Sequence, residues 1–151
     1  MLAVKEYPEY AELRRSHQAA WAEERGLRAE ARRLGRWVQP ELRRFAAARW
    51  PGGRWWGRFG LHPFRLRRRF EPGQVVWWVE RDIPPYDRFT CQAYEVRLAL
   101  DQGKPLLTVC SGAGRRTLPA PDAAALQQAL ARAGQDPPLT IPRQMGVPDE
   151  L

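Results

Sequence analysis

The residues best suited to bind a charged ligand lie in one short stretch, residues 54–70, which reads RWWGRFGLHPFRLRRRF. Residues 50–70 hold six arginines and no acid, so they supply +6 of the net charge of +8. Alternate side chains of a strand share a face at a spacing of about 7 Å, which would put Arg65, Arg67 and Arg69 in one row. Such a row favours an anionic partner, and the phosphates of a nucleic acid are one.

Aromatic residues accompany these arginines, and Trp55, Trp56 and Phe59 could stack on bases. The stretch therefore predicts a nucleic-acid contact, with DNA and RNA not distinguished, through Arg54, Trp55, Trp56, Arg58, Arg65, Arg67 and Arg69. One alternative is that the arginine row pairs with acids of the first helix (Glu23, Glu24 and Glu30) while the tryptophans lie in the core. Another is that the stretch contacts a protein partner.

A second candidate site is the segment 109–117, which reads VCSGAGRRT. Its glycines could direct backbone N–H groups at an anion. Cys110 and Arg116 have the spacing Cys-x5-Arg, and Thr117 follows. The purely structural alternative is that these residues form a glycine-containing turn after a strand.

These nine residues resemble the phosphate loop of the cysteine-dependent protein phosphatases. The resemblance implies Cys110 as the nucleophile, Arg116 as the phosphate clamp and Asp82 or Asp87 as the general acid. The segment departs from the family pattern at Val109, where a histidine usually precedes the cysteine.

Other catalytic patterns are sparse. Asp82 or Asp87, followed by Glu95 and Arg97, imitates a strand-borne carboxylate pair for magnesium, as in nucleases. With two scattered cysteines and two scattered histidines, the sequence gives no zinc-site spacing, so neither a metal nor a cofactor is predicted.

Two helices are predicted at the start of the chain, over residues 8–35 and 40–49. Alanine, leucine, glutamate and arginine dominate the first, with Gly35 as its stop and Pro40 in the first turn of the second. An apolar stripe repeats every seven residues along the first helix: Leu13, Ala20, Leu27 and Leu34.

The period then changes from helical spacing to strand alternation. The predicted strands are 55–61, 64–70, 75–79, 88–100 and 106–110. Residues 88–100 also fit a helix. The strand is preferred because residues 101–104, Asp-Gln-Gly-Lys, resemble a hairpin turn.

A helix over residues 121–133 follows, and the proline-rich tail 135–151 is expected to be extended. Grouped strands rather than strands alternating with helices predict an α+β class with a mainly antiparallel sheet of four to six strands. The chain is expected to be a single domain, 1–151, comprising a helical region (1–50), a sheet with a helix (54–134) and the tail.

No run of 18 uncharged apolar residues exists, and the first residues lack the apolar core of a signal peptide. These observations predict a cytoplasmic protein without a membrane span. The preferred function is a non-catalytic, basic, nucleic-acid-contacting module of a larger assembly. The alternatives are an adaptor or structural subunit that contacts a protein or a second copy through the helix 8–35, and an enzyme acting through Cys110.

Overall fold

The structure is a computed structural model and describes residues 7–52, 54–56, 59–61, 63–83, 89–142 and 149–150. Its elements, in chain order, are α1 (Pro8–Arg49), β1 (Arg54–Trp56), β2 (Phe59–Leu61), β3 (Arg65–Glu71), β4 (Gln74–Asp82), β5 (Thr90–Asp101), β6 (Lys104–Ser111), β7 (Gly114–Thr117), α2 (Ala123–Ala133), β8 (Leu139–Pro142) and β9 (Asp149–Glu150).

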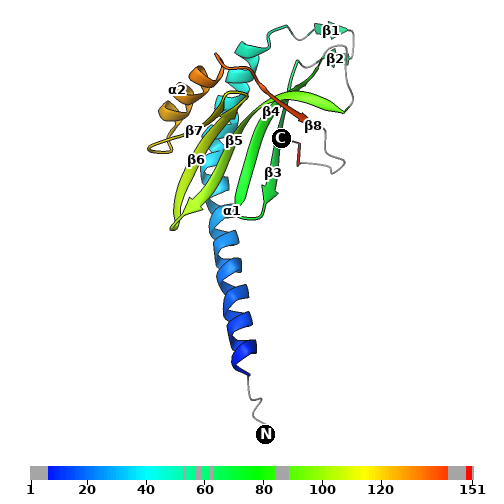
Figure 1. The fold of residues 1–151 in the computed structure, drawn as a ribbon. Coiled ribbons are helices and arrows are strands. Elements are labelled where there is room, and N and C mark those ends of the chain that lie inside the picture. Colours follow the sequence, from blue (N-terminus) through cyan, green and yellow to red (C-terminus); the bar gives the residue numbers. More distant parts are fainter. Residues whose placement is uncertain are drawn as a thin grey trace.

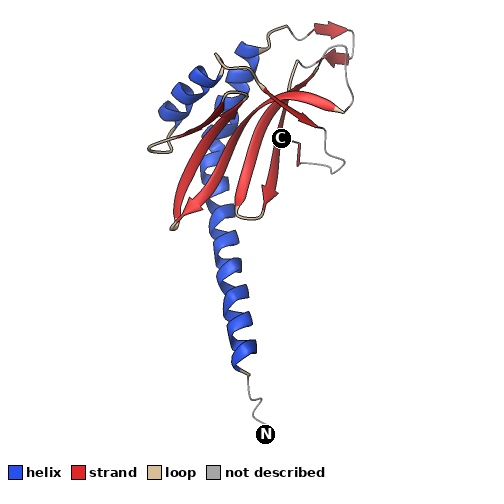
Figure 2. Cartoon of the chain, in the orientation of Figure 1, coloured by secondary structure: helices blue, strands red, loops and turns tan. Residues whose placement is uncertain are grey.

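One antiparallel sheet carries the fold, in the strand order β7-β6-β5-β4-β3-β9. Helix α1 crosses one face of this sheet and continues well beyond its edge, while α2 lies beside α1 and β6 (Figures 1 and 2). The predicted α+β class, with its long first helix, antiparallel sheet and late helix, is confirmed.

The core lies between α1 and the sheet. Alternate residues of the central strands face the helix, so Val75, Trp77 and Val79 of β4 are fully buried. The helix contributes its own stripe at three- and four-residue spacing: Leu27, Ala31, Leu34, Val38 and Leu42. Burial of a large apolar side chain contributes about 1.5–3 kcal/mol, so this layer is the main stabilising feature of the fold.

The predicted break between two N-terminal helices is wrong, because α1 is continuous from Pro8 to Arg49. Gly35 does not end the helix. It is buried, and a Cβ added there would lie 3.7 Å from Cζ2 of Trp77. Pro40 is exposed, and Val38 and Leu42 on either side of it are buried in the core. Their shared packing on the sheet outweighs the hydrogen bond that proline removes.

The strands follow the sequence pattern in most places. Residues 90–101 form a strand, as preferred, and the turn after it has positive φ at Gln102 (50°) and Gly103 (79°). The predicted strand 55–61 is instead a small hairpin of β1 and β2. The sequence does not predict strand β7, because its residues fit a glycine-rich loop equally well.

In the described part of the predicted tail, residues 139–142 and 149–150 are extended strands that belong to the sheet. Strand β8 pairs with residues 90–93 of β5, and β6 pairs with residues 95–101 of the same strand. Strands β8 and β6 thus pair with two consecutive parts of β5. Their junction is closed by a hydrogen bond of 2.7 Å, in which the amide of Gly112 donates to the carbonyl of Pro137.

Candidate functional site

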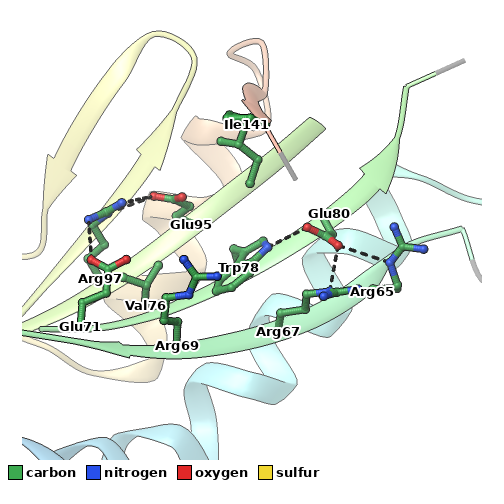
Figure 3. A pocket seen from close by; sticks show the side chains of 11 residues that line it. Arg65, Arg67, Arg69, Glu71, Val76, Trp78, Glu80, Glu95, Arg97 and Ile141 are labelled. Carbon is green, nitrogen blue, oxygen red and sulfur yellow. Dashed lines mark hydrogen bonds and ion pairs between the residues drawn. The ribbon is translucent and has the colours of Figure 1, made fainter. Parts of the chain in front are cut away.

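A cluster of charged side chains covers the face of the sheet opposite α1, around the buried carboxylate of Glu80 (Figure 3). Arg65 Nε lies 3.3 Å and Arg67 Nε 2.8 Å from Glu80 Oε1. Trp78 Nε1 donates a hydrogen bond of 2.9 Å to Oε2, and the thiol of Cys91 donates to the same oxygen at 3.3 Å. Glu80 therefore holds both arginines in place.

Burial alone would raise the pKa of Glu80. The hydrogen bond from Trp78, the charge of Arg67, the hydrogen bond from Cys91 and the charge of Arg65 outweigh burial, so the pKa of Glu80 lies below its ordinary value. The carboxylate is thus ionised at neutral pH, and its charge is matched by guanidinium groups rather than left for a ligand.

A second ion-pair cluster lies further along the same face. Arg97 Nη2 is 2.9 Å from Glu95 Oε2, and Arg97 Nη1 is 3.9 Å from Glu71 Oε2. Arg69 lies between the two clusters with its guanidinium carbon 5.8 Å from the centre of the Trp78 ring. Together these groups line a shallow cavity of about 330 Å³, with Val76 and Ile141 supplying apolar wall.

The predicted arginine row is therefore present, since Arg65, Arg67 and Arg69 line one cavity on one face. Acids of α1 are not its partners, because α1 lies on the other face. Arg65 pairs with Asp82 at 2.8 Å as well as with Glu80. The row carries less free charge than the sequence suggested. The acids responsible sit on the neighbouring strand, where cross-strand register brings Arg65 opposite Glu80.

The remaining predicted contact residues are Arg54, Trp55, Trp56 and Arg58. Arg54, Trp55 and Trp56 form β1, which pairs only with β2 in the part of the chain that the structure describes. Arg58 lies outside the described residues.

The segment around Cys110 differs from the phosphate loop that the resemblance implies. Cys110 lies inside β6, and Arg116 lies on the adjacent strand β7, after a tight turn. Arg116 Nη2 donates to Asp136 Oδ2 at 2.9 Å, and the Gly112 amide is engaged by Pro137. No helix begins at the arginine, and α2 starts only at Ala123.

The electrostatics of the two thiols also oppose nucleophilic chemistry. Burial, followed by the charge of Glu95, raises the pKa of Cys110, whereas a nucleophilic cysteine needs a lowered one. Burial and the neighbouring Glu80 raise the pKa of Cys91 to about 12. Both are free thiols buried in the sheet.

The carboxylates proposed for an acid or metal role are engaged in ion pairs. Asp82 binds Arg65 and Glu95 binds Arg97, while Asp87 is not among the described residues. Within the described ranges, no three His, Cys, Asp or Glu side chains are grouped as metal ligands would be.

A different surface stands out on the first part of α1, residues 8–25, here named the projecting segment. Every side chain in it is exposed except Ala11, which is half-buried. Four large apolar residues at or just before the segment are exposed by 55–71%: Tyr7, Tyr10, Leu13 and Trp21. Figure 1 shows the segment extending past the sheet.

A groove, here named the notch, lies where α1 leaves the sheet. Leu27 and Gly26 of the helix, Phe70 of β3 and Leu100 of β5 line a cavity of about 970 Å³ there, beside the turns at Gly73 and Gly103. Arg28 lies over Phe70, with its guanidinium carbon 4.6 Å from the ring centre. The apolar stripe of α1 thus passes from the core, through the notch, into solvent.

The sequence predicted this stripe, favoured its packing on the protein's own sheet and left open that part of the helix projects. The one signal of a projecting part was length, because a 28-residue helix is about 42 Å long and exceeds the width of a small sheet. In the described part of the chain, no helix is both long and apolar enough to cross a membrane.

Comparison with known proteins adds no relative to this geometry: no family model, no curated protein and no solved structure matches the chain.

Proposed function

We propose that this protein is a non-catalytic binding subunit that joins an assembly through the projecting segment of α1. The observation that carries the proposal is the exposed apolar stripe, in which Leu13 and Ala20 continue the buried row that begins at Leu27 and the exposed Tyr10 and Trp21 lie beside it. A solvated helix normally has a polar surface here, and aromatic residues are enriched where a helix contacts a partner.

The energetics of helix formation also favour a partner on this stripe. An isolated helix of 18 residues is marginal in water, because its stability comes mainly from packing of its apolar face. Burying a residue of the size of Leu13 would contribute about 1.5–3 kcal/mol, and Trp21 is larger. A partner that covers this stripe therefore stabilises both the contact and the helix.

The experiment is site-specific photocrosslinking in the native cell. Benzoylphenylalanine at position 21 replaces an exposed aromatic residue of the stripe, and the matched control carries it at Ala19, on the other side of the helix. Crosslinks to a defined protein from position 21 and none from position 19 support the proposal. Equal crosslinking, or none from either position, contradicts it.

A second candidate function is contact with nucleic acid, and one observation favours it. Arg32, Arg36 and Arg43 are exposed and share one side of α1 because they are spaced by four and seven residues. Arg69 adds a fourth cation on the opposite face of the sheet. Arg65 and Arg67 contribute less, since Glu80 already neutralises part of their charge.

Oligonucleotide binding measured against salt concentration tests this second function. Each phosphate contact contributes about 0.9 to the slope of log K against log salt. Replacing Arg32, Arg36 and Arg43 by Gln should lower the slope by two to three times that amount, about 2–3 in total. The matched triple change of Arg15, Arg33 and Arg44 should leave it nearly unchanged, and absence of binding at low salt rejects the function.

A cytoplasmic location is part of the proposal. It is supported by the two unpaired thiols, Cys91 and Cys110, which are typical of a reducing compartment.

A further inference from the structure

We propose that the partner of the projecting segment is a second copy of this chain, paired antiparallel so that each copy's helix tip enters the other copy's notch. This inference rests on the proposed function, because it uses the same apolar stripe, and it adds the identity and direction of the partner.

The direction follows from what already covers the stripe. From Leu27 onward, the chain's own sheet occupies the apolar side of α1, as Leu34 and Val38 are buried against it. A second helix running parallel along Leu13 and Ala20, which share the side of α1 that bears Leu27, would continue straight into that sheet. An antiparallel helix of the second copy ends at the level where the sheet begins. The second copy then covers the apolar stripe of the projecting segment, and the chain's own sheet covers the stripe from Leu27 onward.

The charges of the segment are ordered so that they complement themselves in reverse. Along the helix come two acids (Glu9 and Glu12), two cations (Arg14 and Arg15), two acids (Glu23 and Glu24) and two cations (Arg25 and Arg28). Reversal about the midpoint between residues 18 and 19 sets acids at the level of cations of the other copy: Glu9 at Arg28, Glu12 at Arg25 and Glu23 at Arg14. A parallel pairing in register sets equal charges at equal levels.

The lengths match this arrangement. Tyr10 precedes Leu27 by 17 residues, which is about 25 Å of helix. When two segments overlap antiparallel over that length, Tyr10 of each copy reaches the level of Leu27 of the other. That level is the notch, where Phe70 and Leu100 provide apolar wall and Arg28 stands at its side. Glu9 of the incoming tip then lies at the level of Arg28.

One existing contact has to be exchanged. Glu24 and Arg28 form an exposed ion pair within the helix, with 3.2 Å between Oε1 and Nη2. Exposed pairs of this kind contribute little to stability, so their exchange for contacts between copies costs little.

Sedimentation equilibrium of the full chain tests the second copy directly. The wild-type chain is expected to be a dimer that dissociates on dilution. Leu13→Glu places a charge in the stripe and should raise the dissociation constant at least 30-fold. Ala19→Glu places the same charge on the opposite side of the helix and should change it less than twofold. Circular dichroism confirms that both variants remain folded, as expected for exposed positions.

Single cysteines test the direction with a short bismaleimide. His17→Cys lies near the proposed symmetry axis and should crosslink to its own copy, whereas Tyr10→Cys should not, because the two positions are separated by about 25 Å in the antiparallel pair. Efficient crosslinking of Tyr10→Cys indicates a parallel pair and overturns the proposed direction. The wild-type chain, with both native thiols buried, is the control.

The outcomes separate this inference from the function on which it rests. A wild-type chain that stays monomeric at all concentrations overturns the second copy. If position 21 then crosslinks to a different protein in the cell, the proposed function stands with another partner. If it crosslinks to nothing, both proposals fail.

Discussion

The two halves of α1 share composition and apolar spacing but differ in what covers them. From Leu27 to Ala46 the stripe is buried on the sheet, with Val38 and Leu42 fully enclosed. At Leu13 and Ala20 the same periodicity is exposed, with the exposed rings of Tyr10 and Trp21 beside it. Amphipathic spacing therefore establishes that a helix has an apolar face, while the extent of the sheet decides whether that face is core or binding surface.

The strongest test of this comparison places the same substitution in each half. Leu34→Asp puts an unpaired carboxylate where the side chain is 1% exposed, and we expect it to lower the free energy of unfolding by more than about 4 kcal/mol. Leu13→Asp, at 55% exposure, should change it by less than about 0.5 kcal/mol in the monomer. Urea unfolding at low protein concentration measures both. A comparable loss for Leu13→Asp would mean that the projecting segment is part of the folded core.

The next test compares ion pairs in the body with ion pairs on the helix. Glu80→Gln removes the buried charge that Arg65 and Arg67 share, so we expect a loss of about 3 kcal/mol in unfolding free energy at pH 7. Glu30→Gln removes only the surface pair with Arg33 and should cost less than about 1 kcal/mol.

The pH dependence of the Glu80 variant has a definite sign. Because the pKa of Glu80 is lowered on folding, its ionisation stabilises the protein above the unfolded-state value of 4.5, and this contribution disappears as the pH falls through the lower folded-state pKa. The difference between wild type and Glu80→Gln should therefore shrink below pH 4.5. A difference that stays constant down to pH 2 would contradict the assignment.

Substitution of glycines is expected to change stability by less, and it tests the same comparison. A Cβ at Gly35 or Gly26 would meet its nearest neighbour at 3.5 Å, an ordinary contact, so Gly→Ala at either position should stabilise the helix by about 0.5–1 kcal/mol. A Cβ at Gly112 would lie 2.7 Å from two backbone carbonyl oxygens, and Gly112→Ala should destabilise the fold. Thermal unfolding distinguishes the signs.

The smallest expected effect concerns thiol reactivity, with no change in stability. Cys91 and Cys110 are buried with raised pKa values, so neither should be alkylated by iodoacetamide at pH 8 until the chain unfolds. A cysteine placed at Ala19, exposed on the other side of the projecting segment, should react at once. Mass spectrometry counts the modified sites, and rapid modification of Cys110 would revive the catalytic interpretation.

Local patterns predicted the elements well where one physical signal dominated. The turn at residues 101–104 and the strand before it depended on alternation and a positive-φ glycine, and both are present. Gly35 and Pro40 led to the wrong prediction of a break in the first helix. Both are local signals for a helix boundary, and the tertiary packing of Val38 and Leu42 overrides them. Strand β8 could not be predicted, since its partner lies about 50 residues earlier in the chain.

The candidate sites show the same limit. Strand alternation correctly placed Arg65, Arg67 and Arg69 on one face, but the neutralisation of Arg65 and Arg67 depends on Glu80 across the strand pair. Spacing alone made Cys110 and Arg116 look like a phosphate loop, whereas a hairpin places them on two strands. Residue types predict which chemistry is available, and pairing decides whether it is already used.

The position of α1 at the start of the chain has a consequence for synthesis. The sheet that covers Leu27, Leu34 and Val38 is built from strands that follow, and β6 ends only at Ser111. At about 5–20 residues per second, roughly 3–12 s separate the emergence of the helix from that of its covering strands. During that interval the whole stripe, buried half and exposed half alike, is available to chaperones and to other nascent chains.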